Sequence, residues 1–379
     1  MLIVTGEASG DLQGARLIEA LWRVDPTLEI EAVGAERIRA TGARLLEDSS
    51  TWGFIGIWDA LVRLPLLWMI WRRLCNVVAR SRPDLVVLID CPGFNMRLAK
   101  VARNLGLRTL YYFPPSAWTK NPERVRTVAR RVDHVVATFA YTERMFQQAN
   151  QPVAYFGHPF LDTVVPEGPR DEVIARLGLP AGRRYVGLLP GSRRAEISRI
   201  SPSIFEAAAR LARSLPDVHF LVPVASPGLS ALVRKTAARH APGLSLTVVE
   251  GGSNAVMTVA DLLIMTSGSA SLEAVIHETP MILVYRLARF DYFLAQFVLT
   301  DFTFMGLPNL VLQRKVVPEL IQHDASPARI CAEAMALLTD PVRLAEMKDN
   351  LLKVKNELGR PGAIDRVAEY IWETISNGP

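Results

Sequence analysis

Short apolar runs alternate along the chain with stretches whose apolar residues recur at helical spacing. In the first half, strands are predicted at 1–5, 84–90, 109–113 and 134–139, with helical patterns at 16–24 and near 98–105. The strand pattern resumes at 185–190, 219–224, 244–250, 261–267 and 281–286. Strands this apolar are typical of parallel sheets covered on both faces. The alternation predicts a doubly wound α/β architecture made of two Rossmann-like sets.

A turn-rich, charged stretch at 158–172, HPFLDTVVPEGPRDE, separates the two sets. We expect an N-terminal domain over 1–165 and a C-terminal domain over 166–359. A predicted helix pair at about 341–377 closes the chain, and its last part, about 360–379, is expected to pack back on the N-terminal domain. The length of 379 residues agrees with two domains, because single cores rarely grow beyond ~250–300 residues.

Composition narrows the class of protein. Hydrophobic residues make up 50% of the chain and charged residues 21%, which is typical of a globular protein with a large core. The net charge of +5 suits an anionic substrate, a membrane surface or nucleic acid. Cys75, Cys91 and Cys331 lack disulfide or zinc spacing, which favours a reducing compartment. No apolar run reaches the ~18–20 residues of a membrane span, and we do not expect MLIV to act as a signal peptide, because no basic region precedes it.

Four polar clusters follow predicted strands, at the edge where parallel sheets bind ligands. The first is TGEASGD, residues 5–11. Its glycines, Gly10 among them, allow the backbone to approach a ligand closely. Ser9 or Asp11 could cap the helix that follows, which is the ordinary structural interpretation. Capping leaves Glu7 unexplained, so we expect this loop to belong to a ligand site.

The second cluster is LIDCPGFN, residues 88–95. Asp90 ends an apolar strand beside a Pro-Gly turn, where a low-dielectric environment raises a carboxyl pKa and suits a general base. A helix-capping or turn aspartate is an equally good interpretation of this segment alone.

The third cluster is LLPGSRRAEISRI, residues 188–200. A strand leads through Gly191 and Ser192 into a helix that has Arg193 at its start. Free backbone N–H groups, the positive helix end and a guanidinium together suit a diphosphate. The alternative is an ordinary turn with a solvated arginine.

The fourth cluster is MTSGSASLEA, residues 265–274. Ser267, Gly268 and Ser269 suit phosphate contacts, and the Glu273 carboxylate can bind both ribose hydroxyls. The alternative is a capping box, S-x-x-E, but Ser269 is out of register with Glu273 by one residue. That misfit favours a functional role for Glu273.

The segment 52–74, WGFIGIWDALVRLPLLWMIWRRL, is more apolar than a crossover between strands requires. Its tryptophans favour a membrane interface, and the arginines that follow favour anionic headgroups. We expect it to dock peripherally on a membrane surface, through Leu66, Leu67, Trp68, Trp71, Arg72 and Arg73. The alternative is a buried helix that begins at Pro65.

Six segments in order, GEASGD, IDCPGFN, LLPGSRRAEI, SGSASLEA, PMILVYR and LPNLVLQRKVVPELIQ, resemble the lipid-A-disaccharide synthase family nearly end to end. The resemblance implies a GT-B glycosyltransferase fold, with two Rossmann-like domains facing a cleft. It implies inverting transfer of 2,3-diacylglucosamine from its UDP derivative to 2,3-diacylglucosamine 1-phosphate, which yields the β-1,6 disaccharide 1-phosphate and UDP. It implies these two substrates and a membrane surface as partners, with no cofactor, no metal and no nucleic acid, on the inner face of the cytoplasmic membrane.

By its motifs, the resemblance implies catalytic roles for Asp90, Glu7 and Asn309. Which of the two carboxylates acts as the general base stays open, and Asp90 is the better candidate. The resemblance implies substrate contacts from Ser9, Gly10, Asn95, Ser116, Trp118, Gly191, Ser192, Arg193, Glu196, Ser267, Gly268, Ser269, Glu273, Tyr285 and Arg286. The chain departs from the family's pattern at Gly93, Pro114, Lys120 and Asn121.

Two other functions are compatible with these motifs. One is another UDP-sugar enzyme of GT-B type, such as a different transferase or an epimerase. No strong histidine cluster supports an epimerase, and His158, beside the predicted domain boundary, is interpreted as structural. The other is a non-catalytic paralogue that binds UDP-sugars or lipid surfaces. Retention of Glu7, Asp90, Arg193 and Glu273 favours the enzyme.

Overall fold

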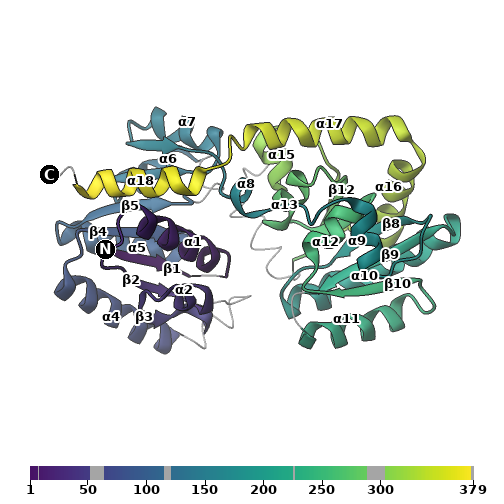
Figure 1. Ribbon diagram of the computed structural model, residues 1–379, viewed down its shortest axis with the longest axis horizontal. Helices are drawn as coiled ribbons and strands as arrows, with labels where there is room; N and C mark the ends of the chain where they lie inside the picture. The colour runs from purple at the N-terminus through teal and green to yellow at the C-terminus, as the bar shows by residue number, and fades with distance from the viewer. Residues whose placement is uncertain (7, 52–63, 115–120, 225–226, 288–303, 377–379) are drawn as a thin grey trace. The chain divides into compact units, whose positions relative to one another are not determined.

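The computed structural model describes residues 1–379 except 7, 52–63, 115–120, 225–226, 288–303 and 377–379. The chain forms two compact units, coloured along the sequence in Figure 1. Unit 1 consists of Met1–Asp162 with Leu358–Pro379, and unit 2 of Thr163–Glu357. Within the described ranges, no helix combines the length and apolar character needed to cross a membrane.

Unit 1 contains a seven-stranded sheet in the order β3-β2-β1-β4-β5-β6-β7. Its strands are β1 (Leu2–Thr5), β2 (Glu31–Gly34), β3 (Arg44–Asp48), β4 (Leu85–Ile89), β5 (Arg108–Tyr112), β6 (His134–Ala137) and β7 (Val153–Tyr155). All neighbours pair in parallel. The predicted strands β1, β4, β5 and β6 are confirmed, whereas β2, β3 and β7 were not predicted.

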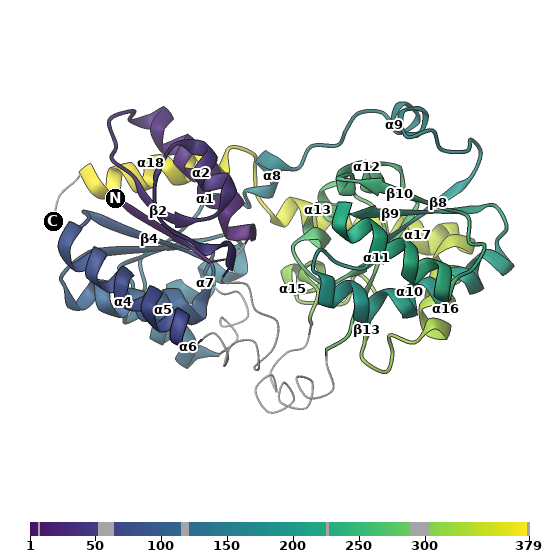
Figure 2. The same cartoon turned by 90° about the horizontal axis from the view of Figure 1, so that it is seen from below.

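Helices cover both faces of this sheet (Figure 2). The helices of unit 1 are α1 (Ala8–Val24), α2 (Glu36–Thr41), α4 (Leu64–Ser81), α5 (Pro92–Asn104), α6 (Pro122–Ala129), α7 (Ala140–Gln148), α8 (Phe160–Thr163, at the junction of the units) and α18 (Ala363–Ser376). Apolar residues of α4, α5 and α6 share one core with the sheet. Residues of α1, α2 and α18 share the other, so the last helix of the chain packs within unit 1.

Unit 2 has a six-stranded sheet in the order β10-β9-β8-β11-β12-β13, again with parallel neighbours. Its strands are β8 (Arg184–Leu189), β9 (Val218–Val224), β10 (Leu246–Glu250), β11 (Leu262–Thr266), β12 (Met281–Tyr285) and β13 (Glu319–Ile321). The first five were predicted and are confirmed. The sequence analysis missed the short strand β13.

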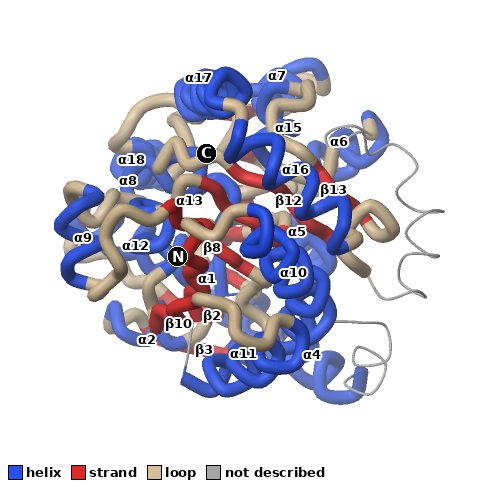
Figure 3. Tube along the Cα trace, turned by 90° about the vertical axis from the view of Figure 1, so that its right-hand side faces the viewer, coloured by secondary structure: helices blue, strands red, loops and turns tan. Residues whose placement is uncertain are grey.

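The helices of unit 2 are α9 (Arg170–Arg176), α10 (Arg194–Ser214), α11 (Pro227–His240), α12 (Ser253–Val259), α13 (Ala270–Ile276), α15 (Leu307–Leu312), α16 (Pro327–Thr339) and α17 (Pro341–Glu357). Helix α10 packs against α11 and α16, while α13 packs against α15 and α17. Helices, blue in Figure 3, therefore flank the red strands, as expected for apolar strands that must be covered on both faces.

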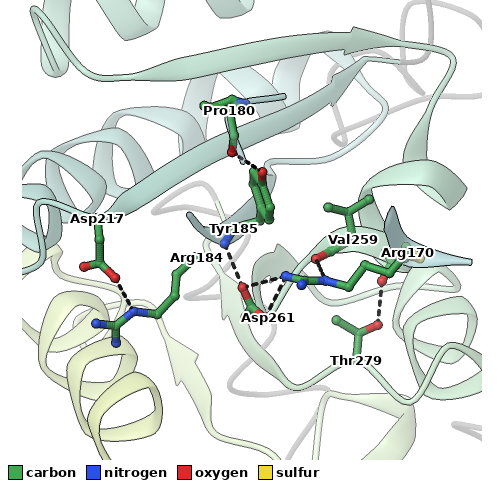
Figure 4. Close-up of polar contacts among 9 residues, drawn as sticks. Arg170, Pro180, Arg184, Tyr185, Asp217, Val259, Asp261 and Thr279 are labelled. Atoms are coloured by element: carbon green, nitrogen blue, oxygen red, sulfur yellow. Dashed lines mark hydrogen bonds and ion pairs between the residues drawn. The ribbon is translucent and has the colours of Figure 1, made fainter. Parts of the chain in front are cut away.

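Charged residues tie the unit 2 sheet together at its amino edge, where the strands begin (Figure 4). The Asp261 carboxylate accepts hydrogen bonds from the Arg170 guanidinium at 3.0 and 3.1 Å and from the Tyr185 N–H at 2.8 Å. Arg184, at the start of β8, pairs with Asp217 at 2.6 Å. These contacts link α9 and the starts of β8, β9 and β11 at the amino edge, opposite the edge where ligands of such sheets bind.

Candidate active site

Each sheet has one switch point, where the order of strands reverses. In unit 1 it lies between β1 and β4, and in unit 2 between β8 and β11. In open α/β sheets, ligands bind in the crevice beyond the carboxyl ends of the strands at such a point. The four polar clusters found in the sequence follow β1, β4, β8 and β11. The topology therefore brings them together in pairs, one pair at each switch point.

Asp11, in the first cluster, stabilises a neighbouring helix. Its carboxylate accepts hydrogen bonds from the backbone N–H groups of Ala35 at 2.6 Å, Arg37 at 3.0 Å and Ile38 at 3.3 Å. These groups begin α2, whereas Asp11 itself lies inside α1. The prediction that Asp11 caps the helix that follows it was therefore wrong. A carboxylate that accepts three N–H groups at a helix start is a structural element.

Gly10 lies buried at the start of α1, facing the sheet. A Cβ atom there would lie 3.3 Å from the Thr5 Cβ and 3.8 Å from the Ile89 carbonyl oxygen. The glycine therefore allows α1 to pack close to β1 and β4, and a contact with substrate stays a prediction. Ser9 is exposed at this switch point. Glu7 lies outside the described residues.

The Asp90 turn is held in an uncommon backbone conformation. Asp90 and Cys91 have φ angles of 52° and 46°, in the left-handed region, which costs non-glycine residues about 1–3 kcal/mol each and is concentrated at functional sites. Asn95 Nδ2 donates to the carbonyl oxygens of Ile89 at 3.0 Å and Asp90 at 2.8 Å. The Tyr111 hydroxyl donates to the same Asp90 carbonyl at 2.8 Å. Two donors on one carbonyl fix the turn that presents Asp90.

Asn95 is fully buried and its amide nitrogen is used by this turn. The amide nitrogen of Asn95 therefore holds the turn, and the substrate contact expected from the sequence stays a prediction. Burial raises the pKa of the Tyr111 hydroxyl well above its usual value, and the nearby Asp90 adds to this shift. Tyr111 consequently stays a hydrogen-bond donor throughout the physiological pH range. The sequence analysis missed Tyr111, which stands inside an apolar strand.

Two of the positions that depart from the family's pattern have simple structural explanations. Gly93 is exposed near the start of α5, and a Cβ atom there would meet nothing within 4 Å, so the helix has room for a larger residue at this position. Asn121 caps α6, because its side-chain oxygen accepts from the N–H groups of Glu123 at 3.0 Å and Arg124 at 3.4 Å. Ser116, Trp118 and Lys120 lie outside the described residues.

His158 is buried among aromatic rings and is not placed for proton transfer. Its ring lies 5.1 Å from that of Phe139 and 4.7 Å from that of Phe160, and its Nδ1 accepts the Phe160 N–H at 3.1 Å. Burial lowers the pKa of His158 to about 3, so the ring is neutral. This arrangement agrees with the structural role predicted for it.

The third cluster forms a tight turn before α10. Gly191 has a φ of 115°, and a Cβ atom there would lie 2.5 Å from Glu196 Oε2, so the position requires glycine. Arg193 occupies the N-cap position of α10, and its guanidinium lies 3.8 Å from the Glu196 carboxylate. Glu196 therefore orders the turn, while Ser192 and Arg193 are exposed at the switch point of unit 2.

The fourth cluster combines a fixed hydroxyl with exposed small residues. The Ser267 hydroxyl donates to the Met305 carbonyl at 2.9 Å, so it anchors a neighbouring segment. Gly268 and Ser269 are exposed, and Ser269 makes no side-chain capping bond, as the misfit with a capping box predicted. Burial raises the pKa of the Glu273 carboxyl. Among the described residues, the Glu273 side chain has no hydrogen-bond or ion-pair partner.

Arg286 and Asn309 are occupied by contacts inside unit 2. Arg286 donates to the Ser203 hydroxyl at 2.9 Å and to the Gln322 carbonyl at 3.4 Å, which fastens the end of β12 to α10. Tyr285 is half-buried at the end of the same strand. The Asn309 side chain is fully buried and hydrogen-bonded through both its oxygen and its nitrogen. These contacts give Asn309 a structural function within unit 2, and the catalytic role expected from the sequence stays a prediction.

Helix α4 divides the predicted docking residues between the core and the surface. Trp71 is half-buried and packs edge-on against Phe94, at 5.4 Å between ring centroids, so part of its ring belongs to the core and its docking role stays a prediction. Arg73 pairs with Glu47 at 3.0 Å. Trp68 is 57% exposed, and the Arg72 guanidinium lies 4.8 Å over its ring. The side chains of Leu66 and Leu67 lie outside the described residues.

A sequence model of the lipid-A-disaccharide synthetase family matches residues 1–370 of the chain. The chain belongs to this family. It is 39% identical over 375 residues to the lipid-A-disaccharide synthase of Geobacter sulfurreducens, with 99% of this chain and 97% of the relative covered. The lipid-A-disaccharide synthase of Geobacter metallireducens is 36% identical over 375 residues, with the same coverage.

Solved structures agree on the fold. A UDP-N-acetylglucosamine 2-epimerase from Neisseria meningitidis, solved with UDP-GlcNAc bound, superposes with a TM-score of 0.66 at 14% identity, covering 100% of this chain and 99% of its own. A putative UDP-N-acetylglucosamine 2-epimerase from Listeria monocytogenes gives 0.69 at 14% identity, covering 99% and 96%. At this identity the likeness shows the GT-B type of fold and no activity.

Family membership decides between the functions that the motifs left open. The protein is a glycosyltransferase of the lipid-A-disaccharide synthase family. The activity of that family is the transfer of 2,3-diacylglucosamine from its UDP derivative to 2,3-diacylglucosamine 1-phosphate, with release of UDP. Its substrates are accordingly a UDP-sugar donor and a lipid acceptor. The epimerases found among the solved structures share the fold with this chain at 14% identity.

Proposed function

We propose that the switch point of unit 2 binds the UDP part of the donor and that the switch point of unit 1 presents Asp90 to the acceptor. This division rests on the strand order, which places two of the four polar clusters at the switch point of each sheet. Exposed Ser192, Arg193 and Ser269 suit a diphosphate, and a desolvated carboxylate at Glu273 suits the two ribose hydroxyls. The strained turn at Asp90 supports a catalytic role in unit 1.

The proposed reaction is a single inverting displacement. Asp90 accepts the proton of the acceptor hydroxyl, whose oxygen attacks the anomeric carbon of the donor. The bond from that carbon to the diphosphate oxygen breaks, and the electron pair leaves with UDP. Arg193 and the N–H groups at the start of α10 stabilise the charge of the leaving diphosphate. No step requires a metal ion, and no Asp-x-Asp motif occurs in the sequence.

The donor half of the proposal predicts a role for Arg193 in binding UDP. Arg193→Ala is expected to weaken UDP binding about tenfold or more, because a charge-assisted contact contributes roughly 1.5–3 kcal/mol. Isothermal titration calorimetry with UDP measures the change. Arg213→Ala, an exposed arginine at the far end of the same helix, controls for loss of charge and should bind UDP normally. An unchanged dissociation constant in Arg193→Ala would rule out the assignment.

An assay of UDP release tests the whole proposal. Purified protein with both acylated sugars should release UDP and form the disaccharide in equal amounts, and neither sugar alone should support turnover. Chelation of divalent ions should leave the rate unchanged. Binding of UDP without any release would instead support a non-catalytic paralogue.

We further propose that α4, α5 and α6 face an anionic bilayer on the cytoplasmic side. Trp68 and Met69 are 57% and 58% exposed on α4, and exposed cations follow on the neighbouring helices and just beyond α6: Arg97, Lys100, Arg103, Arg126 and Arg130. The sequences of the three helices contain one acidic residue, Glu123. Each cation near an anionic surface contributes about 1 kcal/mol, so this face supports docking next to a lipid acceptor.

The docking proposal predicts that the exposed apolar residues of α4 contribute to vesicle binding. A W68S/M69S variant is expected to bind phosphatidylglycerol vesicles about tenfold more weakly, because its parent buries this apolar surface in the interface. Vesicle co-sedimentation measures binding, and UDP affinity should stay unchanged. Trp372→Ser, a 37% exposed tryptophan on α18 and so on the other face of the sheet, is the matched control. Equal vesicle binding by the variant and its parent would exclude this surface.

A further inference from the structure

Glu319, the first residue of β13, organises the segment that leads into α15. Its Oε2 accepts the Met305 N–H at 2.9 Å, and its Oε1 accepts the Gly306 N–H at 3.0 Å. The same Oε1 accepts Asn309 Nδ2 at 2.6 Å. One carboxylate therefore holds two consecutive backbone amides and one side chain. Asn309 connects this segment to the residues before β13, because its Oδ1 accepts the N–H groups of Val316 and Val317 at 2.6 and 2.9 Å.

Close packing shows that the segment has little freedom to move. A Cβ atom on Gly306 would lie 2.2 Å from Leu283 Cδ1 and 3.0 Å from Glu319 Oε1. Gly306 thus allows the backbone to lie directly on β12, and Leu283 is the residue of β12 that pairs with Glu319 in the sheet. The segment is consequently clamped between strand β12 and the Glu319 carboxylate.

Met305 connects the Glu319 carboxylate to the turn at residues 267–269. The Met305 N–H is held by Glu319, and the Met305 carbonyl accepts the Ser267 hydroxyl at 2.9 Å. Ser267 directly precedes Gly268 and Ser269, the exposed residues at the switch point. A chain of contacts therefore runs from Glu319 through Met305 to Ser267, and within unit 2 it connects β13 to the end of β11.

We propose that Glu319 is a positioning residue for the donor site, acting on the 267–269 turn through Met305. This inference rests on the proposed binding of UDP at that turn. It gives Ser267 and Asn309, which were expected to touch substrate or take part in catalysis, a shared role in holding the site's geometry. Loss of the carboxylate leaves two backbone N–H groups without their acceptor, so the segment shifts and the turn loses its anchor.

The test compares UDP binding in four variants. Glu319→Gln keeps the size of the side chain but replaces one acceptor oxygen by a donor, and is expected to weaken UDP binding about tenfold. Glu319→Asp retains both oxygens and should recover part of that loss. Ser267→Ala should weaken binding as well. The double variant E319Q/S267A should bind no more weakly than the poorer single variant, because both changes break the same chain of contacts.

Glu278→Gln is the matched control for a purely structural effect. Glu278 is another carboxylate of unit 2, paired with Lys355 at 2.6 Å. Its loss is expected to lower thermal stability and to leave UDP affinity unchanged. If Glu319→Gln also leaves UDP affinity within twofold of the parent, or if the double variant shows additive losses, the positioning role is overturned.

Hydrogen–deuterium exchange without ligand separates this inference from the proposed function. Peptides that cover residues 265–272 should take up deuterium faster in Glu319→Gln than in the parent, and Glu278→Gln should match the parent there. If the parent itself binds no UDP, the proposed donor site fails. Deuterium uptake alone then tests whether Glu319 acts on the 267–269 turn. Unchanged uptake in Glu319→Gln overturns that inference.

Discussion

Asp90→Asn is expected to lower turnover by about 10²–10⁴-fold while UDP binding persists, because an amide cannot accept the acceptor proton. The substitution suits the fold. Asparagine is among the non-glycine residues that tolerate the left-handed region, where Asp90 has a φ of 52°. The donors that fix this turn, Asn95 and Tyr111, bind the Asp90 carbonyl, which the variant retains. Turnover is measured by UDP release at saturating substrates, and binding by calorimetry.

Asp84→Asn provides the control for this experiment. Asp84 is exposed immediately before β4, so it lies at the opposite end of the same strand from Asp90. Its substitution should leave turnover unchanged. If Asp90→Asn keeps more than about a tenth of the parent's turnover, Asp90 is not the general base, since base catalysis typically contributes 10²–10⁴-fold. Glu7→Gln would then test the remaining carboxylate.

The interior strands other than β2 could be predicted because burial on both faces leaves a continuous apolar run in the sequence. Strands β1, β4 and β11, for instance, read LIVT, LVVLI and LLIMT. The missed strands have weaker signals. Strand β3, at the edge of its sheet, reads RLLED, and β13 has three residues. An edge strand is covered less completely, so its sequence tolerates charges that hide the pattern.

The location of the candidate site at the switch points stays a prediction, but the strand ends that define it could be found in the sequence, because they are visible as polar clusters. The partners of individual polar side chains could not. Asp11 was interpreted as a possible cap of its own helix and Asn309 as a catalytic residue, yet each binds backbone groups brought near by tertiary structure. Helix phase could have separated Trp68 from Trp71. Ile70, Leu74 and Val78 mark the buried face at helical spacing, and Trp71 adjoins it.

Glu273→Gln is expected to raise the stability of the free protein and to weaken UDP binding, two effects of opposite sign. Burial raises the pKa of the Glu273 carboxyl above its value in the unfolded chain. The ionised form therefore opposes folding at neutral pH, and the chain gains stability as pH falls through the raised folded pKa. A neutral glutamine removes this opposition. The melting temperature at pH 7 should rise by about 2–4 °C for each kcal/mol recovered.

The pH dependence provides a check on the cause of that stabilisation. Below the unfolded carboxyl pKa, at about 4.3, Glu273 is protonated in both states of the parent. The difference in melting temperature between Glu273→Gln and the parent should therefore shrink towards zero as pH falls from 7 to below 4. A difference that is independent of pH would show that the gain comes from packing and not from removal of a charge.

The ionised Glu273 carboxylate destabilises the fold, so we expect it to have a function, and the function that we propose is UDP binding. Two ribose hydroxyls donating to the ionised Glu273 contribute about 1.5–3 kcal/mol, so Glu273→Gln should bind UDP about tenfold more weakly or worse in calorimetry. Glu250→Gln, an exposed carboxylate at the end of the edge strand β10 of the same sheet, should change neither property. Unaltered UDP affinity, or a lower melting temperature, in Glu273→Gln would mean that the carboxylate has a structural partner and does not hold the ribose.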